Sequence, residues 1–396
     1  MTGDNVENGL LKQIKFELND NTPGEKQKND MICYDIMHGE KKVAEIDTRG
    51  KATVLNERFI PYDLYLEEGC DFDTLINNMN NFYHWCASRV LSLDRKYAKE
   101  ILNSIGMAQA MTDRDRAKIS LSYHCVSLTD IYWVKKSDED ISYEKINLYD
   151  NSLNEAVVEL SLRGKPMTVT NQELAPDLST KGCFPKAWIR RGKDFILLKD
   201  GGDDAVQKEL LASRLCQCFD FKQVKYEEGF YDGQKVTQSK MITSKQYSIV
   251  SKMAFEIYAQ NHDLAVLDEC LRIDKETYYG MNILDYLVGN IDRHPENWGL
   301  LVDNQTNKYI SLYPIMDLNQ SFGSYDTIDG ANCQTVYPEK KTQREAAIEA
   351  VRNIGLHQIK DIDGELFEDK IEWKEMFFRR LEELKNAVDD SGNMRF

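Results

Sequence analysis

The region between residues 275 and 313 has the clearest pattern of hydrophobic and polar positions in the chain. From residue 275 to residue 288 the large apolar side chains recur along one helical face, and Gly289 with Asn290 then signals the end of a helix. Pro295 prevents the next segment from continuing as helix. Residues 298–302 and 309–313 are short apolar runs around a polar turn, so they predict a hairpin that returns the chain toward the loop.

The rest of the pattern mixes strands with helices. Strand-like runs occupy residues 31–52, where two of them flank Gly39, and residues 195–199 and 235–243. Helical periodicity occurs twice within residues 72–111, and again in residues 206–216, 343–354 and 371–388. This order predicts an α/β (α+β) chain with a mainly helical C-terminal part.

Composition narrows the class of protein. The chain has 396 residues, 42% hydrophobic and 10% aromatic, so two or three globular units with substantial cores are expected. Its formal net charge of -16 argues against broad binding to nucleic-acid phosphates or anionic lipid surfaces. We therefore expect no direct nucleic-acid binding and no membrane association.

The cysteines and the termini indicate a cytoplasmic protein. Nine cysteines without a Cys-x-x-Cys pair predict neither a disulfide framework nor a zinc site. The N-terminus lacks the pattern of a signal peptide, and no apolar run approaches the length of a membrane span. Residues 1–30 are polar and charged, which predicts a mobile N-terminal segment.

Asp292, Asn297 and Asp317 have the clearest chemical implication. Asp292 and Asn297 have the Asp-x-x-x-x-Asn spacing of a kinase catalytic loop, and the predicted hairpin would bring Asp317 back to them. Phosphoryl transfer needs such oxygen ligands for Mg²⁺ and a carboxylate that orients the attacking hydroxyl. The alternative is that Asp292 and Asn297 are turn formers or helix caps.

The sequence Asp292-Arg-His-x-x-Asn297, followed by Tyr313-Pro-x-x-Asp317, resembles the catalytic segment of HipA-like serine/threonine kinases, an atypical bacterial branch. Lipid kinases of the phosphoinositide type share the Asp-Arg-His-x-x-Asn order, whereas ordinary protein kinases place His-Arg before the Asp. The long separation between Asn297 and Asp317, and the Leu-Asn that follows Asp317, favour the HipA-like branch.

The resemblance implies a two-lobed, protein-kinase-like fold behind an additional N-terminal module. The expected boundaries are a mobile segment at residues 1–30, an accessory module at 31–165, an ATP-binding N-lobe at 166–243 and a helical catalytic C-lobe at 244–396. The segment of residues 127–134 looks like one found in bacterial relatives, and we expect it to dock the accessory module against the lobes. Trp85, His84 and Arg89 are expected to be packing or surface residues.

An ATP-binding lobe should contain a lysine at the end of a strand. Lys199 follows the apolar run 195–198, and Glu209 on the next predicted helix is the candidate that would orient it. Taken alone, Lys199 could be a solvated surface charge and Glu209 an ordinary exposed helix residue. Further on, residues 235–243 resemble a strand leading into a kinase hinge, which makes Met241 and Ile242 candidate neighbours of adenine.

Residues 179–188 resemble the phosphate-covering loop of the family. Gly182 would let backbone amides approach the phosphates, and Lys186 would add positive charge. Ser179 stands where HipA-like kinases carry an autophosphorylated serine that ejects the loop, although Thr180 is equally placed chemically.

Together these features predict phosphoryl transfer from ATP, with Mg²⁺, to a serine or threonine of a protein. Asp292 would orient the hydroxyl, and Asn297 and Asp317 would hold metal. The substrate protein is unknown, and relatives of HipA suggest an antitoxin-like regulatory partner. The alternatives are a lipid or small-molecule kinase and a regulatory protein that binds nucleotide without transfer.

Overall fold

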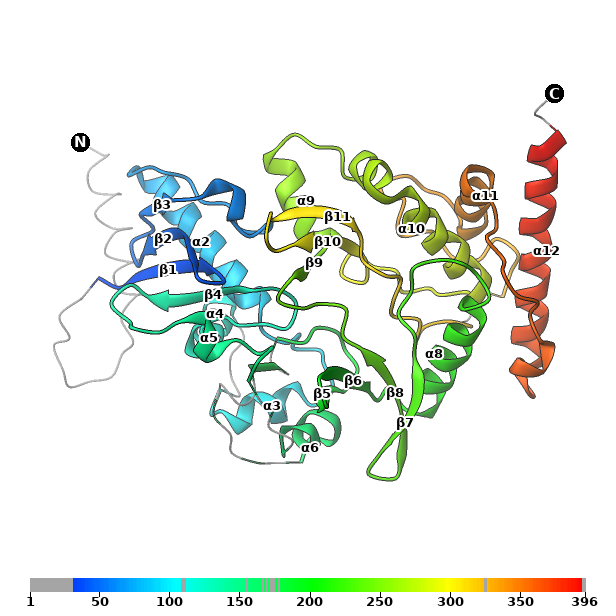
Figure 1. The fold of residues 1–396 in the computed structure, drawn as a ribbon, viewed down its shortest axis with the longest axis horizontal. Coiled ribbons are helices and arrows are strands. Elements are labelled where there is room, and N and C mark those ends of the chain that lie inside the picture. The colour runs from blue at the N-terminus through cyan, green and yellow to red at the C-terminus, as the bar shows by residue number, and fades with distance from the viewer. Residues whose placement is uncertain are drawn as a thin grey trace, which may run out of the picture. The chain divides into compact units, whose positions relative to one another are not determined.

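Antiparallel β-sheets and the helices around them make up the described part of the chain (Figure 1). The computed structural model describes residues 31–107, 112–151, 153, 156–165, 167, 170, 175–176, 179–323 and 326–393. From Cys33 onward the chain forms a single compact unit, which is the unit described below. The segment of residues 1–30, predicted to be mobile, lies outside the described residues.

The first sheet joins the predicted N-terminal hairpin to a strand from much later in the chain, in the order β3-β2-β1-β4. Its strands are β1 (Cys33–His38), β2 (Lys41–Asp47), β3 (Ala52–Val54) and β4 (Tyr132–Lys136). Between β3 and β4 the chain forms η1 (Glu57–Phe59), α2 (Phe72–Ser88), α3 (Ala98–Ser104) and α4 (Asp113–Ser122), and α5 (Tyr143–Ile146) follows β4. Asp71 caps α2 by accepting from the Thr74 backbone N–H, and the buried face of α2 adds Phe82 and Trp85 to the core under the sheet.

The second sheet has the order β5-β6-β8-β7 and carries the predicted nucleotide-lobe strands. Its elements are β5 (Lys186–Arg191), β6 (Asp194–Lys199), β7 (Glu227–Tyr231), β8 (Gln234–Lys240), α6 (Ala156–Arg163) and α8 (Asp203–Cys216). The strand ending in Lys199 and the helix after it are therefore confirmed. The register pairs Lys199 with Lys186 on β5 and with Thr237 on β8.

The third sheet, in the order β11-β10-β9, lies beside the mainly helical C-terminal part. Its elements are β9 (Tyr247–Ser251), α9 (Lys252–Asn261), α10 (Val266–Val288), β10 (Gly299–Asp303), β11 (Lys308–Leu312), α11 (Gln343–Ile354), η2 (Gly364–Phe367) and α12 (Ile371–Asn393). The predicted hairpin is β10–β11. Helix α10 begins earlier than predicted and is interrupted at Asp274, after which its inner face is almost entirely buried.

Gly299 explains how β9 approaches the loop after α10. A Cβ at this position would lie 2.1 Å from the Val250 carbonyl oxygen, a distance that real side chains do not tolerate. Without one, the Lys252 backbone N–H donates to the Trp298 carbonyl at 2.8 Å. The start of α9 is thereby fixed beside the predicted catalytic loop. Among the described helices, none has both the length and the apolar character that crossing a bilayer would require.

Candidate functional site

Arg293 holds the loop that follows α10. Its guanidinium forms two bonds of 2.8 Å to the Asp285 carboxylate on α10, and it also donates to the carbonyls of Asn297 and Met316. All of these groups are buried or nearly so, and the paired Asp285 raises the pKa of Arg293 despite the opposing effect of burial. One side chain therefore ties the helix, the loop and the segment before Asp317 into a fixed arrangement.

The hydrogen bonds of Asn297 fix the orientation of its side-chain amide. The side-chain nitrogen donates to the Asp292 carbonyl at 2.9 Å, and the backbone N–H donates to the His294 carbonyl at 2.9 Å. The His294 ring accepts from the Glu296 backbone N–H at 3.2 Å. Because the amide nitrogen of Asn297 is used in the loop, its oxygen is the end that remains available for a cation.

Asp317 has a backbone conformation that few residues other than glycine adopt. Its φ is 60°, and its backbone N–H donates to the Tyr226 hydroxyl at 2.9 Å. One carboxylate oxygen accepts from Lys199 Nζ at 2.7 Å and from Asn319 Nδ2 at 2.6 Å. A strained residue held by contacts on both sides is common where a side chain must point at a ligand.

Lys199 forms a buried triad with Glu209 and Asp317. The Lys199 Nζ is 2.7 Å from both Glu209 Oε1 and Asp317 Oδ1, and Glu209 Oε2 accepts from the Thr237 hydroxyl at 2.6 Å. Burial alone would lower the pKa of Lys199, but the two carboxylates raise it well above its usual value. Burial likewise acts to raise the pKa of Asp317, and Lys199 and Lys186 hold it below its usual range. Lys199 and Asp317 are therefore both charged near neutral pH.

The loop before β5 turns two lysines in different directions. Gly182 has a φ of 98°, and a Cβ there would lie 2.5 Å from Lys186 Nζ, so glycine leaves the space that the ammonium occupies. Lys186 Nζ donates to the Lys181 carbonyl at 2.6 Å and is buried. Burial, and then the Lys199 charge, lower the pKa of Lys186 to about 8. Lys181 instead extends outward and pairs with Glu296 at 3.0 Å.

The two hydroxyls considered for phosphorylation are both hydrogen-bonded. Ser179 Oγ donates to the Pro176 carbonyl at 3.2 Å, and its side chain is buried. Thr180 Oγ1 donates to the same carbonyl at 2.6 Å and accepts from Trp188 Nε1 at 3.0 Å. Either hydroxyl would have to leave this position to reach a phosphate.

Most of the predicted site residues line one cavity of about 270 Å³. Its lining includes Ser179, Gly182, Lys186, Lys199, Met241, Ile242, Asn297 and Asp317. Asp292 and Glu209 are not on the lining; Glu209 lies behind Lys199, and Asp292 is half-buried beside the cavity. Burial raises the pKa of Asp292, with His294 opposing the rise and Asp317 adding to it, so the two aspartates lie within electrostatic reach of each other.

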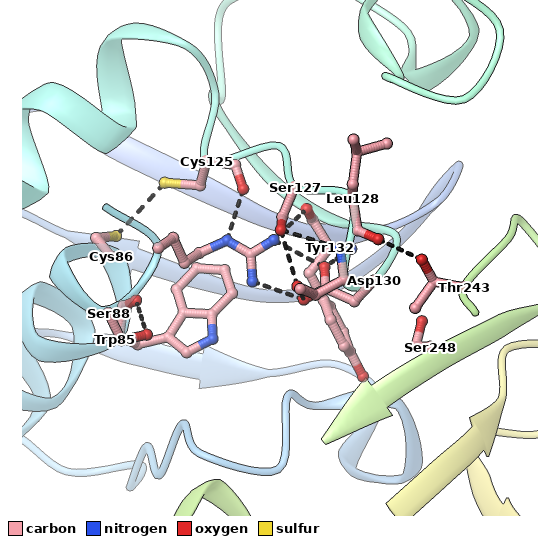
Figure 2. Close-up of polar contacts among 12 residues, drawn as sticks. Trp85, Cys86, Ser88, Cys125, Ser127, Leu128, Asp130, Tyr132, Thr243 and Ser248 are labelled. Atoms are coloured by element: carbon pink, nitrogen blue, oxygen red, sulfur yellow. Dashed lines mark hydrogen bonds and ion pairs between the residues drawn. The ribbon is translucent and has the colours of Figure 1, made fainter. Parts of the chain in front are cut away.

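The far wall of the cavity comes from the first sheet and α2, which sequence patterns did not suggest. Figure 2 shows the Asp130 carboxylate and the neighbouring Trp85 and Tyr132 around a guanidinium, that of Arg89. The expectation that Trp85 and Arg89 are packing residues is confirmed by their burial, and both also line the cavity. His84 is exposed and pairs with Asp113.

The segment 127–134 contacts β9 and the residues just before it, where the sequence predicts a kinase hinge. The Leu128 carbonyl accepts from the Thr243 hydroxyl (Figure 2), and the Thr129 carbonyl accepts from the Ile249 backbone N–H at 2.9 Å. The connection between the second and third sheets is therefore attached to the N-terminal part of the chain.

Asp285, Tyr226 and Thr237 support the site without having been predicted. Asp285 could have been predicted, because it is a charged residue within the apolar face of α10 and needs a buried partner. Thr237 and Tyr226 could not, since their contacts with Glu209 and Asp317 depend on strand register and on the path of the loop before β7.

Comparison with known proteins finds similarity in structure alone. No protein-family profile matches the chain. A search of curated proteins finds no match either. Solved structures do match: one is HipA of Shewanella oneidensis MR-1, from a toxin–antitoxin complex with HipB and operator DNA, with 11% identity, 91% of each chain covered and a TM-score of 0.50. Another is the proinflammatory kinase CtkA of Helicobacter pylori, with 15% identity, a TM-score of 0.40, and 53% of this chain and 95% of that chain covered.

The sheets, the helical C-terminal part and the similarity to HipA show that the chain has an α/β, kinase-like fold. The fold is that of HipA-like kinases, and the predicted fold class is confirmed. At 11% identity this similarity concerns the fold.

Proposed function

We propose that this protein is a kinase that uses ATP and Mg²⁺ to phosphorylate a serine or threonine of a protein. The observation that carries the proposal is the triad of Lys199, Glu209 and Asp317, with 2.7 Å contacts, at a cavity that also contains Asn297. A lysine positioned by a helical glutamate, facing a metal-binding carboxylate and amide, is the set of groups that phosphoryl transfer needs.

The donor set suits a magnesium ion. Asp317 supplies a carboxylate and Asn297 an amide oxygen, and Mg²⁺ prefers such hard oxygen ligands. When bound with ATP, the ion neutralises charge on the phosphate oxygens. In the free protein the Lys199 ammonium contacts the Asp317 oxygen, so this lysine compensates a charge that metal would otherwise balance.

The remaining residues have distinct roles in the proposed reaction. Lys199, held by Glu209, would bind the α- and β-phosphates, and Lys186 with the backbone around Gly182 would bind the other phosphate oxygens. Met241 and Ile242 would contact adenine. Asp292 would orient the acceptor hydroxyl and take its proton as the oxygen bonds to the γ-phosphorus and the bond to the β–γ bridging oxygen breaks.

The test is transfer of radiolabelled γ-phosphate from Mg-ATP to a generic protein acceptor. Asp292→Asn and Asp317→Asn are expected to lower the rate at least about a hundredfold, since each removes a charge used in transfer. Asp361→Asn is the matched control, because Asp361 is an exposed aspartate in the C-terminal part. Equal labelling by all four proteins would contradict the proposal.

The same reaction separates the alternatives. A lipid or small-molecule kinase would label those acceptors in preference to protein, and a regulatory nucleotide-binding protein would bind ATP without transferring phosphate. Mass spectrometry of the product tests Ser179 as the regulatory phosphosite, and the finding of phosphate at neither Ser179 nor Thr180 would remove it.

The proposal extends to an antitoxin-like regulatory partner. Its support is the shared fold with a HipA protein whose solved complex includes HipB. Coexpression with the product of a neighbouring gene, followed by purification of a stable complex, is the corresponding test.

A further inference from the structure

The turn between α2 and α3 contains one buried arginine among exposed neighbours. Arg95 is 2% exposed, whereas Leu93, Asp94 and Lys96 are exposed. Arginine is rarely buried unless its guanidinium donors have acceptors, because an unpaired buried charge is strongly unfavourable. The acceptors of Arg95 therefore show what this turn holds in place.

Arg95 contacts the loop of residues 180–186, which includes the predicted phosphate-covering residues. Its Nη1 donates to the Thr180 carbonyl at 3.3 Å, and its Nη2 donates to the Lys186 carbonyl. Between these two positions the Cys183 carbonyl accepts from the Lys96 backbone N–H at 2.9 Å. The turn is thus attached to the start, the middle and the end of the loop.

Packing of α3 fixes the position of the turn. Ala98, Ile101 and Leu102 are buried in a core that also contains Phe195 of β6. The Ala98 backbone N–H donates to the Arg95 carbonyl at 2.9 Å, so the arginine stands at the start of this helix. Because one core joins α3 to the second sheet, the turn has a fixed position relative to the strands that carry Lys186 and Lys199.

The contact also brings a further cation to Lys186. Arg95 donates to the backbone carbonyl of Lys186, and the Lys186 ammonium lies in the space that Gly182 leaves. Burial, and then the Lys199 charge, lower the pKa of Lys186, and the Arg95 charge acts in the same direction. Like charges held together in a buried site are unfavourable in the free protein, and bound phosphates would offset the repulsion. The arrangement therefore favours an anion at this loop.

We propose that Arg95 is a positioning residue, through which the N-terminal part holds the loop of residues 180–186 in the conformation that binds the phosphates of ATP. The proposal rests on the proposed function and gives the N-terminal part a role in it. Arg95 acts through the loop backbone, and Lys186 with the amides around Gly182 makes the phosphate contacts.

Hydrogen–deuterium exchange of the free protein tests the attachment without nucleotide. In Arg95→Gln the backbone amides of residues 180–186 should exchange at least about tenfold faster than in the wild type, because the loop has lost a charged donor at both ends. Arg95→Lys should restore part of the protection, since an ammonium still donates to a carbonyl. Unchanged exchange in Arg95→Gln would overturn the proposal.

Steady-state kinetics with varied ATP tests the consequence for binding. Arg95→Gln should raise KM for ATP about tenfold and leave kcat at saturating ATP within about twofold of the wild type, with Arg95→Lys in between. A role in stability alone would lower kcat, through loss of folded enzyme, and leave KM unchanged. That second outcome contradicts the positioning role.

Arg190→Gln is the matched control. Arg190, toward the other end of β5 from Lys186, also donates to two backbone carbonyls, those of Tyr149 and Asn151 at 2.6 and 3.1 Å. The control variant should lose thermal stability as well, yet keep the wild-type loop exchange and KM for ATP. Equal effects of Arg95→Gln and Arg190→Gln on the loop would mean that it responds to any loss of stability, and the proposal would be wrong.

The wild type decides the matter if the Arg95 variants do not fold. Magnesium with a non-hydrolysable ATP analogue should slow exchange in residues 180–186 and at Lys96 together, and slowing in the loop alone would overturn the proposal. The kinase function fails separately. If the wild type neither binds ATP nor transfers phosphate, the kinase proposal is wrong, and exchange in the free protein still shows whether Arg95 holds the loop.

Discussion

Lys186 and Lys199 are partners across two strands, yet their ammonium groups have opposite pKa shifts. Lys199 has two carboxylates at 2.7 Å, whereas Lys186 Nζ donates to a neutral carbonyl at 2.6 Å and lies near the Lys199 charge. Lys186 therefore loses its proton near pH 8, while Lys199 stays charged. The cleft that we propose to bind phosphates thus has one permanent cation and one whose charge depends on pH.

This difference predicts how ATP binding depends on pH. The folded-state pKa of Lys186, about 8, lies below that of a free lysine, about 10.4. For stability, this means that the free energy of unfolding rises as pH increases from 8 toward the unfolded pKa. Phosphates favour the charged form, so binding at higher pH must take up a proton. We expect the ATP dissociation constant to rise about tenfold between pH 7 and pH 9.

Isothermal titration calorimetry in buffers of different ionisation enthalpy measures both the affinity and the proton uptake. Lys186→Met should bind more weakly at pH 7 and change little with pH. Lys235→Met, which alters an exposed lysine of the same sheet, should keep the wild-type profile. A wild-type affinity that is constant over this range would show that Lys186 does not contact the phosphates.

At the scale of elements, the loop before β5 depends on one glycine. Gly182→Ala would place a methyl group 2.5 Å from Lys186 Nζ and require an alanine at a φ of 98°, so the ammonium must move. We expect KM for ATP to rise at least about tenfold, since one charge-assisted phosphate contact is lost. Steady-state kinetics with varied ATP measures this change.

Gly192→Ala is the control for backbone strain. Gly192 also has a positive φ, 63°, in the turn between β5 and β6, but the space around an added Cβ is open among the described residues. This substitution should lower the free energy of unfolding by about 1 kcal/mol and leave KM for ATP as in the wild type. Similar KM values for the two alanine variants would contradict the role given to Gly182.

Elements were predictable from sequence where their signals are local, and contacts between distant segments were not. The hairpin β10–β11, the strand ending in Lys199 and α8 follow from periodicity and turn residues. The start of α10 was missed because Asp274 leaves the helical conformation and caps the Thr277 backbone N–H, so that the predicted start at residue 275 is where the second part of the helix begins. The triad of Lys199, Glu209 and Asp317 was predictable only because these residues follow the order found in HipA-like kinases. No sequence pattern indicated the Arg89–Asp130 wall.

At the scale of the whole compact unit, the N-terminal part contacts both β9 and the turn between β10 and β11. The Thr129 carbonyl accepts from the Ile249 backbone N–H, and the hydroxyls of Tyr62 and Tyr132 donate to the Asn307 carbonyl and Oδ1 at 2.8 and 3.1 Å. If the second sheet closes on the helical C-terminal part, it must therefore move relative to the N-terminal part or carry that part with it. The stability of the cavity wall formed by Arg89 and Asp130 therefore affects the whole cleft.

Arg89 is the residue through which this stability is tested. Its side chain and that of Asp130 are 6% and 13% exposed, so Arg89→Met leaves a nearly buried carboxylate without its partner. We expect the free energy of unfolding in urea to fall by about 3 kcal/mol, and the double variant Arg89→Met, Asp130→Asn to recover part of that loss because no uncompensated charge remains. Arg272→Met, at a side chain that is 61% exposed and paired with Glu269, should lower it by less than about 1 kcal/mol. Equal losses for the two arginine variants would mean that the Arg89–Asp130 pair does not hold the wall of the cavity.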